Sequence, residues 1–538
     1  MSLTFDANKY AYPSSRHVQF AKNGMVCTSQ PLAAQAGLAM LQAGGNAVDA
    51  ALATAIALTV LEPTSNGLGS EAFCICWIKD KMYGMNGSGF SPEALTREAV
   101  IKAGHAAEVP KRGLIPVMVP GAPALWAKLH KKFGKLPFAK LFAPAIHYAE
   151  EGFPLSPTIS QLWAKGYDIF KAFEGRREFA PWFNTFAPRG RAPKVGELVK
   201  FPDHAKTLRL IANSYAEDYY HGEIADAIDK FSRETGGYLR KSDLEQYDAE
   251  WVEPIHTNYR GYDVWELPPN GHGIVALMAL NILAGFNFAE KETPETYHKQ
   301  IEAMKLAFID GMTYVADPRF MKTKLDDMLS SEYAAARREL IGKTALDPKP
   351  GNPFSGGTVY MCSADKEGNM VSLIQSNFMG FGSGIVIPGY GISLNNRGQC
   401  FKMDPTFDNC LAPLKKPYHT IIPGFLTKDG KPIGPFGVMG GYMQPQGHVQ
   451  VMMNTLDFLM NPQQALDAPR WQWVGGKKVE LEAGVDPKII DYLKDHGHEV
   501  EVVKDLINFG RGQIIWRTDE NVLCGATEPR ADGTVACF

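Results

Sequence analysis

The stretch Thr358–Ser376, TVYMCSADKEGNMVSLIQS, contains two apolar runs on either side of a turn rich in Asp, Gly and Asn. This pattern predicts a β-hairpin, in which Gly368 takes the left-handed conformation that a short loop needs. If the hairpin is centred on Glu367, the first residue of the stretch, Thr358, faces the last, Ser376. A bulge would shift this pairing by one residue.

The predicted Thr358–Ser376 pair has two interpretations. Cross-strand pairs of hydroxyl residues are common in sheets and can be purely structural. The segment before the hairpin, Ser355–Gly357, favours a second interpretation, because it is flexible and poor in side chains. Glycine permits the unusual backbone geometry that a hydroxyl needs to attack the carbonyl just before it. Thr358 is therefore a candidate nucleophile that cuts the chain after Gly357.

The rest of the chain alternates helical and strand-like patterns. Its 538 residues indicate two to four domains or one large multilayer domain. Helices are expected over 31–44, 47–62, 122–133, 138–151, 223–235, 296–315, 448–460 and 487–496, with Asn46 as the N-cap of the second. Strands are expected over 73–78, 358–364, 370–376, 384–387 and 420–426. Sheets with helices on both outer faces fit this order, so the fold class is α+β.

Composition excludes several classes of protein. The net charge of −3 and the absence of a basic stripe argue against nucleic-acid binding. The longest apolar stretch, Ala47–Leu61, contains Asp49 and is too short to cross a bilayer. The N-terminus lacks the apolar segment of a secretory signal, so a cytoplasmic location is expected. No CxxC or HExxH motif occurs, which predicts neither a metal nor a cofactor. Gly67–Ala72 loosely fits GxGxxA, but it follows a helix, which argues against a dinucleotide site.

Several motifs together resemble one known family. The hairpin with its preceding GGT is followed by GFGSGI and GISLNN, and the N-terminal half contains PLAAQAGLAMLQAGGNAVDAA, LEPTSNGLG, LIPVMVPGAPALW and YRGYDVWELPPNGHGI. In this order they resemble the gamma-glutamyltranspeptidase family of N-terminal-nucleophile hydrolases, over most of the chain from about Pro31 to Arg517. The resemblance implies a four-layer αββα sandwich.

The resemblance also implies a mechanism. Members of the family cut themselves before a threonine, here Thr358, which would give segments 1–357 and 358–538 that stay together as a heterodimer. A dimer of such heterodimers is a further expectation. The new α-amino group serves as general base, and Thr358 takes an acyl group from a γ-glutamyl or related amide. The matching glycine pair, Gly440 and Gly441, would hold the oxyanion, and Ser376 would position the new amine.

Substrate-binding positions depart from the family pattern. The arginine that binds the α-carboxylate of glutamate is replaced around Ser88, and the Gln and Asp that grip its α-amine are replaced by Arg397 and Cys400. The family's serine pair is matched by His419 and Thr420. Asn377, which follows Ser376, is a further candidate for a substrate contact through its side-chain amide.

These departures leave three interpretations of Arg397. Without an anionic partner, it would favour an anionic acyl group that lacks an α-amine, such as glutaryl, as in the cephalosporin-acylase-like branch. It could instead take over the lost carboxylate contact, so that γ-glutamyl groups still bind. It could also be a surface residue in a salt bridge. A hypothesis of another class is an unprocessed relative that binds a metabolite without turnover.

Overall fold

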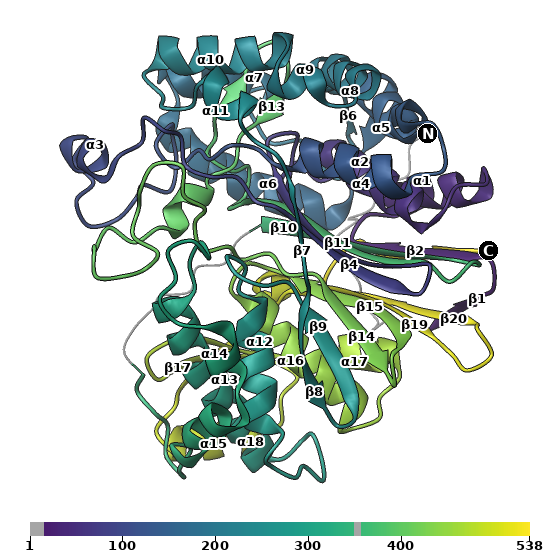
Figure 1. Ribbon diagram of the computed structural model, residues 1–538, viewed down its shortest axis with the longest axis vertical. Coiled ribbons are helices and arrows are strands. Elements are labelled where there is room, and N and C mark those ends of the chain that lie inside the picture. The colour runs from purple at the N-terminus through teal and green to yellow at the C-terminus, as the bar shows by residue number, and fades with distance from the viewer. Residues whose placement is uncertain (1–14, 349–356) are drawn as a thin grey trace, which may run out of the picture.

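The computed structural model describes residues 15–348 and 357–538. Two seven-stranded sheets face each other at its centre (Figure 1). In the first sheet the strand order is β21 (Thr534–Cys537), β2 (Gly24–Thr28), β10 (Gly357–Asp365), β11 (Met370–Phe378), β3 (Glu71–Ile78), β4 (Lys81–Gly87) and β7 (Glu250–Val252). In the second it is β1 (Gln19–Ala21), β20 (Leu523–Thr527), β19 (Arg511–Arg517), β15 (Lys431–Met439), β14 (Gly424–Lys428), β9 (Tyr262–Glu266) and β8 (Ile255–Tyr259). Strands β10 and β11 pack against β15, and β10 and β2 also pack against β19, so these strands contribute to the contact between the two sheets.

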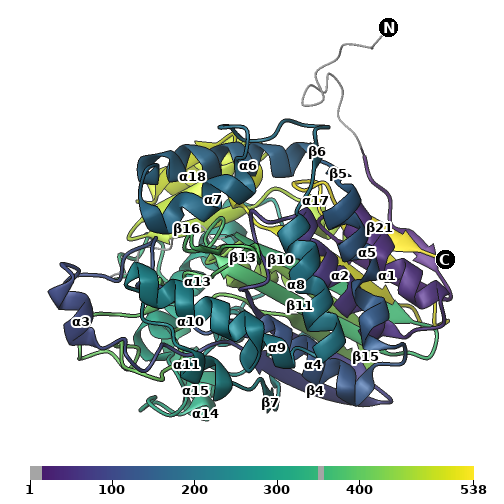
Figure 2. The ribbon, with the colours of Figure 1, turned by 90° about the horizontal axis from the view of Figure 1, so that it is seen from above.

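Helices cover the outer face of the first sheet. They are α1 (Pro31–Gln42), α2 (Ala47–Leu61), α4 (Ala122–Phe133), α5 (Phe138–Glu151), α6 (Pro157–Phe170), α8 (Pro202–Ser214), α9 (Glu217–Tyr220) and α10 (Glu223–Thr235). Helix α2 lies directly on β10 and β11, and α5 and α8 lie outside it (Figures 1 and 2). As predicted, Asn46 caps α2, in a capping box with Asp49. Every side chain of α2 is buried, because this helix lies between the sheet and a second helical layer.

A second group of helices covers the other sheet. It comprises α12 (Gly273–Leu283), α13 (Pro294–Tyr314), α16 (Met443–Leu456), α17 (Pro462–Asp467) and α18 (Pro487–Asp495). Helix α12 packs on β8 and β9, and α16 packs on β15, while α13 lies outside α12 (Figure 1). A small sheet of β16 (Trp471–Gly475), β17 (Lys478–Glu482) and β18 (Glu499–Val503) adjoins α13 and α18. The predicted α+β class, with sheets between outer helices, is therefore confirmed.

Two predicted elements begin four or five residues from the expected position. The helix expected from His448 begins at Met443 instead. Pro445 does not prevent this earlier start, because it lies in the first turn, where the backbone N–H has no partner within the helix. Position 447, inside this helix, favours glycine, because a Cβ there would lie 2.6 Å from the Val438 side chain. The strand expected from Thr420 begins at Gly424 instead. No helix within the described ranges is long and apolar enough to span a bilayer.

Candidate active site

Thr358 lies at the start of the central strand β10, next to a bulge. The predicted hairpin register holds from Val359 opposite Gln375 to the turn, and then shifts so that Gly357 faces Phe378. The hydroxyl of Thr358 nevertheless donates to the hydroxyl of Ser376, with 3.2 Å between the oxygens. Both side chains are buried. The structure therefore brings the two predicted hydroxyls together.

Ser376 connects the Thr358 hydroxyl to the carbonyl that would be attacked. Its Oγ donates to the carbonyl oxygen of Gly357 at 2.6 Å and accepts the backbone N–H of Phe378 at 2.7 Å. Phe378 has a φ of +78°, a conformation that non-glycine residues rarely adopt and that is enriched at functional sites. This backbone geometry turns the Phe378 N–H toward Ser376. The result is a hydroxyl relay from Thr358 through Ser376 to the Gly357 carbonyl.

Gly357 is confined by the loop that follows α2. A Cβ at this position would lie 3.0 Å from the carbonyl oxygen of Thr64 and 3.2 Å from the Cα of Ser65. Only glycine fits without displacing that backbone. Ser355 and Gly356, which complete the predicted flexible lead, lie outside the described residues.

The glycine pair forms the turn between β15 and α16. Gly440 and Gly441 have φ values of +137° and +60°, which favour glycine. Their carbonyls accept the N–H groups of Met443 and Gln444, which starts the helix. The Gln444 side chain then reaches Thr358, with 3.5 Å between its Nε2 and Oγ1 of the threonine. Gln444 thus links the turn predicted to hold the oxyanion to the candidate nucleophile. The sequence did not indicate this residue.

Arg397 is fully buried and has an anionic partner, so the prediction that it lacks one is wrong, as is the surface interpretation. Its Nε donates to Oε2 of Glu71 at 2.9 Å, and its Nη1 donates to the hydroxyl of Thr420 at 2.7 Å. The same Glu71 oxygen accepts Nε2 of His419 at 2.9 Å. Glu71 pairs with Ser376 across β3 and β11, so the cluster adjoins the hydroxyl relay.

Glu71 and Arg397 form a buried ion pair. Burial opposes ionisation of Glu71, but the hydrogen bonds from His419 and Arg397, together with the charge of Arg397, outweigh it and hold the pKa of that carboxyl below its usual value. Burial, together with the Arg397 charge, lowers the pKa of His419 to about 4, so its imidazole is neutral at pH 7. The other Glu71 oxygen accepts the N–H of Gly89. Among the described residues, Nη2 of Arg397 has no hydrogen-bond partner.

Asn377, His272 and His448 have structural contacts. The Asn377 amide hydrogen-bonds to the hydroxyls of Ser70 and Ser393, and the described residues show no hydrogen bond between it and Thr358. His448 lies in α16 and links the N–H of Val438 to Glu266. His272 hydrogen-bonds through Nδ1 to the hydroxyl of Tyr418.

One buried trio has side chains of the kind that hold metals: His298, Glu302 and His498. Lys305 lies 2.8 Å from Glu302 and neutralises it. Nδ1 of His298 and Nε2 of His498 are 2.9 Å apart. Nε2 of His298 also lies 2.9 Å from the carbonyl oxygen of Gly342. Hydrogen bonds between the two rings and to the backbone account for these contacts.

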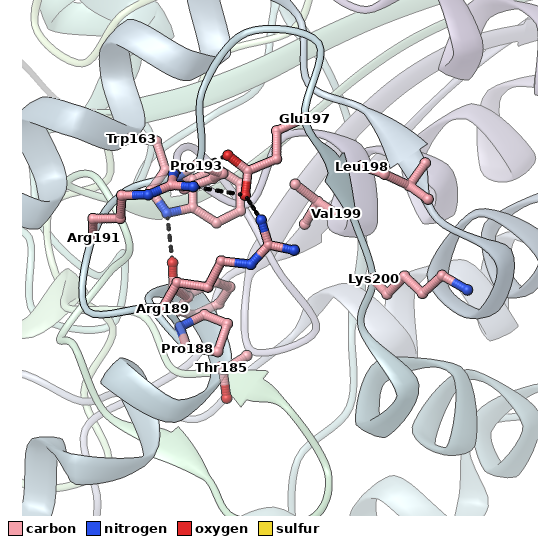
Figure 3. A pocket seen from close by; sticks show the side chains of 11 residues that line it. Trp163, Thr185, Pro188, Arg189, Arg191, Pro193, Glu197, Leu198, Val199 and Lys200 are labelled. Atoms are coloured by element: carbon pink, nitrogen blue, oxygen red, sulfur yellow. Dashed lines mark hydrogen bonds and ion pairs between the residues drawn. The ribbon is translucent and has the colours of Figure 1, made fainter.

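A separate cavity of about 360 Å³ lies beside Trp163 (Figure 3). Arg189 and Arg191 line it, and both pair with Glu197. None of the predicted site residues lines this cavity.

Comparisons with known proteins identify the family. Residues 33–538 match the family described as Gamma-glutamyltranspeptidase. The chain is 36% identical over 523 residues to the glutathione hydrolase-like YwrD proenzyme of Bacillus subtilis, over 95% of this chain and 97% of that protein. It is 31% identical over 532 residues to the oxamate amidohydrolase proenzyme of Klebsiella pneumoniae, over 96% of this chain and 98% of that protein.

Among solved structures, the cephalosporin acylase from Bacillus halodurans matches with a TM-score of 0.97 and 59% identity, over 100% of this chain and 99% of that one. The similarity therefore covers both the helical N-terminal part and the hairpin that carries Thr358. The chain belongs to the gamma-glutamyltranspeptidase family and is an amide-cleaving enzyme of that family.

Proposed function

We propose that the chain cuts itself before Thr358 and then uses that residue as an N-terminal nucleophile. The observation that carries this proposal is the hydroxyl relay from Thr358 through Ser376 to the Gly357 carbonyl. Oγ1 of Thr358 attacks the carbonyl carbon and loses its proton, and the C–N bond then breaks as the amide nitrogen takes up that proton. The resulting ester is then hydrolysed by water. Ser376 activates the carbonyl by donating to its oxygen, where negative charge develops.

The released α-amino group has an ordinary pKa of about 7.7–8, so at neutral pH it can act as general base for its own hydroxyl. Thr358 attacks a substrate amide, the amine leaves with a proton, and water hydrolyses the acyl ester. Gly440 and Gly441 would offer backbone donors to the oxyanion. The turn that contains them is linked to Thr358 through Gln444, which supports this assignment.

We propose γ-glutamyl amides, or related acyl amides, as substrates. Relatives named glutathione hydrolase and acylase support this range. The arrangement around Arg397 favours acyl groups that end in a carboxylate and lack an α-amine, such as glutaryl. Glu71 already accepts three hydrogen bonds and pairs with Arg397, so it is a poor partner for an ammonium group. Nη2 of Arg397, which has no partner among the described residues, would donate to the carboxylate.

We also propose that segments 1–357 and 358–538 form the two subunits of one αββα sandwich, the fold of N-terminal-nucleophile hydrolases. The strand order supports this, because each sheet contains strands of both segments. Pairing of such heterodimers and a cytoplasmic location are further parts of the proposal. Asn377 would act by supporting the loop around the site.

The proposal is tested by following the purified chain on a denaturing gel and by sequencing the new N-terminus. Two pieces, the smaller starting at Thr358, are expected. The substrate is tested by comparing γ-glutamyl and glutaryl anilides, of which the glutaryl compound is expected to react faster. A chain that stays intact and inactive while binding a metabolite would instead support the hypothesis of an unprocessed relative.

A further inference from the structure

The side chain of Gln444 is fully buried in the first turn of α16, and its orientation is fixed. Its Oε1 accepts the backbone N–H of Ile422 at 3.0 Å. An N–H donor can be met only by the amide oxygen, so this contact identifies which end of the amide is which. The NH₂ group therefore points to Oγ1 of Thr358, 3.5 Å away.

We propose that Gln444 is a catalytic residue that donates a hydrogen bond to Oγ1 of Thr358 while that oxygen carries negative charge. This inference rests on the proposed function. In deacylation, water adds to the acyl ester, and the bond between the carbonyl carbon and Oγ1 then breaks. Its electron pair goes to Oγ1, which takes up a proton from the α-ammonium group. The Gln444 N–H stabilises the oxygen during this step.

The contacts of Oγ1 assign this task to Gln444. The other side chain hydrogen-bonded to Oγ1 in the described structure is Ser376, which accepts from it rather than donating. A contact of 3.5 Å is long for a neutral hydrogen bond, but such bonds shorten when the acceptor becomes charged, and catalytic contacts often tighten only during reaction. An amide does not titrate, so the donor is present at every pH at which the α-amine works.

Gln444 and the glycine pair would stabilise different oxygens. Gly440 and Gly441 serve the carbonyl oxygen of the acyl group, whereas Gln444 serves the departing Oγ1. The backbone N–H of Gln444 donates to the carbonyl of Gly441 at 3.2 Å, so one short turn holds both sets of donors. Their spacing is therefore set by the start of α16.

The test compares Gln444→Met with Gln446→Met. Methionine keeps the length of the side chain and removes the amide. Gln446 is an equally buried amide on the same helix, but its amide contacts only the backbone of Tyr442 and Trp473. With a chromogenic anilide, Gln444→Met should keep its initial burst, while the steady rate per active site falls about 10²-fold, the usual effect of losing such a donor. The 358–538 piece should accumulate the mass of the acyl group.

The Gln446→Met control should lose stability but keep its rate per active site. An unchanged steady rate in Gln444→Met, or a slower burst without acyl accumulation, would overturn the proposal. If Gln444→Met stays full-length, hydroxylamine should cleave the ester trapped before Thr358 into two pieces, and resistance to hydroxylamine would also overturn the proposal. Failure of the proposed function itself would be seen separately, as a wild-type chain that never exposes Thr358.

Discussion

Two neighbouring regions at the end of β11 differ in the groups that form them, since one is neutral and the other contains buried charges. The hydroxyl relay around Thr358 consists of neutral groups, namely hydroxyls, backbone amides and one glutamine. The cluster around Glu71, one strand away, contains a buried ion pair between Glu71 and Arg397. Under the proposed function, reaction at Thr358 needs no fixed charge until cleavage creates an amine. Substrate recognition, by contrast, would use this ion pair, in which Nη2 of Arg397 has no partner among the described residues.

The largest expected effect comes from removing the centre of the neutral region. Thr358→Ala should leave the chain uncut and lower amidase activity by about 10⁶-fold, as found when a catalytic nucleophile is lost. A denaturing gel and an anilide assay measure both effects. Thr358→Ser, which keeps a hydroxyl, should still cut itself. Cleavage at the same bond in Thr358→Ala would disprove the role of this residue.

Ser376→Ala removes the middle of the relay. Self-cleavage should slow by about 10²-fold, because the Gly357 carbonyl loses a donor where charge develops. The rate is measured as the decay of the full-length band after expression is stopped. Ser376→Thr keeps the hydroxyl and should restore most of the rate. Equal rates for alanine and threonine would show that the relay is only structural.

Arg397→Lys tests the charged region while leaving a cation beside Glu71. Lysine lacks the planar group whose Nη2 has no partner in the described structure. The preference for a glutaryl anilide over a butyryl anilide should therefore fall about tenfold, the size of one charge-assisted hydrogen bond. The ratio of kcat/KM for the two substrates measures it. A parallel loss on both substrates would mean that Arg397 acts on folding alone.

The smallest expected effect concerns the stability of the charged region. His419 has a folded pKa of about 4 against an ordinary 6.5, so between these values the unfolded chain binds more protons. Stability should therefore fall as the pH drops from 6.5 toward 4, by up to about 1.4 kcal/mol per pH unit from this residue. Urea unfolding at pH 7 and pH 5 measures this. In His419→Asn the dependence should be weaker, and an equal dependence would contradict the assignment.

The sequence predicts local features of this protein well. The hairpin register from Val359 onward and the capped helix after Asn46 depend on residues close in the chain, and both are found. The partner of Arg397 could not be predicted, because Glu71 lies 326 residues away and only sheet pairing brings them together. Gln444 was missed for a different reason. Its neighbours Pro445 and Gly447 signal a loop, whereas the structure accommodates both inside a helix.

The order of strands in the first sheet has a consequence for assembly. Counted from the proposed cut, β21, β10 and β11 belong to the C-terminal segment, whereas β2, β3, β4 and β7 belong to the N-terminal one. Strand β2 lies between β21 and β10, so neither segment holds all the strands of this sheet. Separated pieces would expose several unpaired strand edges, which invite aggregation. The mature enzyme should therefore melt in one cooperative transition, and mixing its isolated pieces should not reconstitute it.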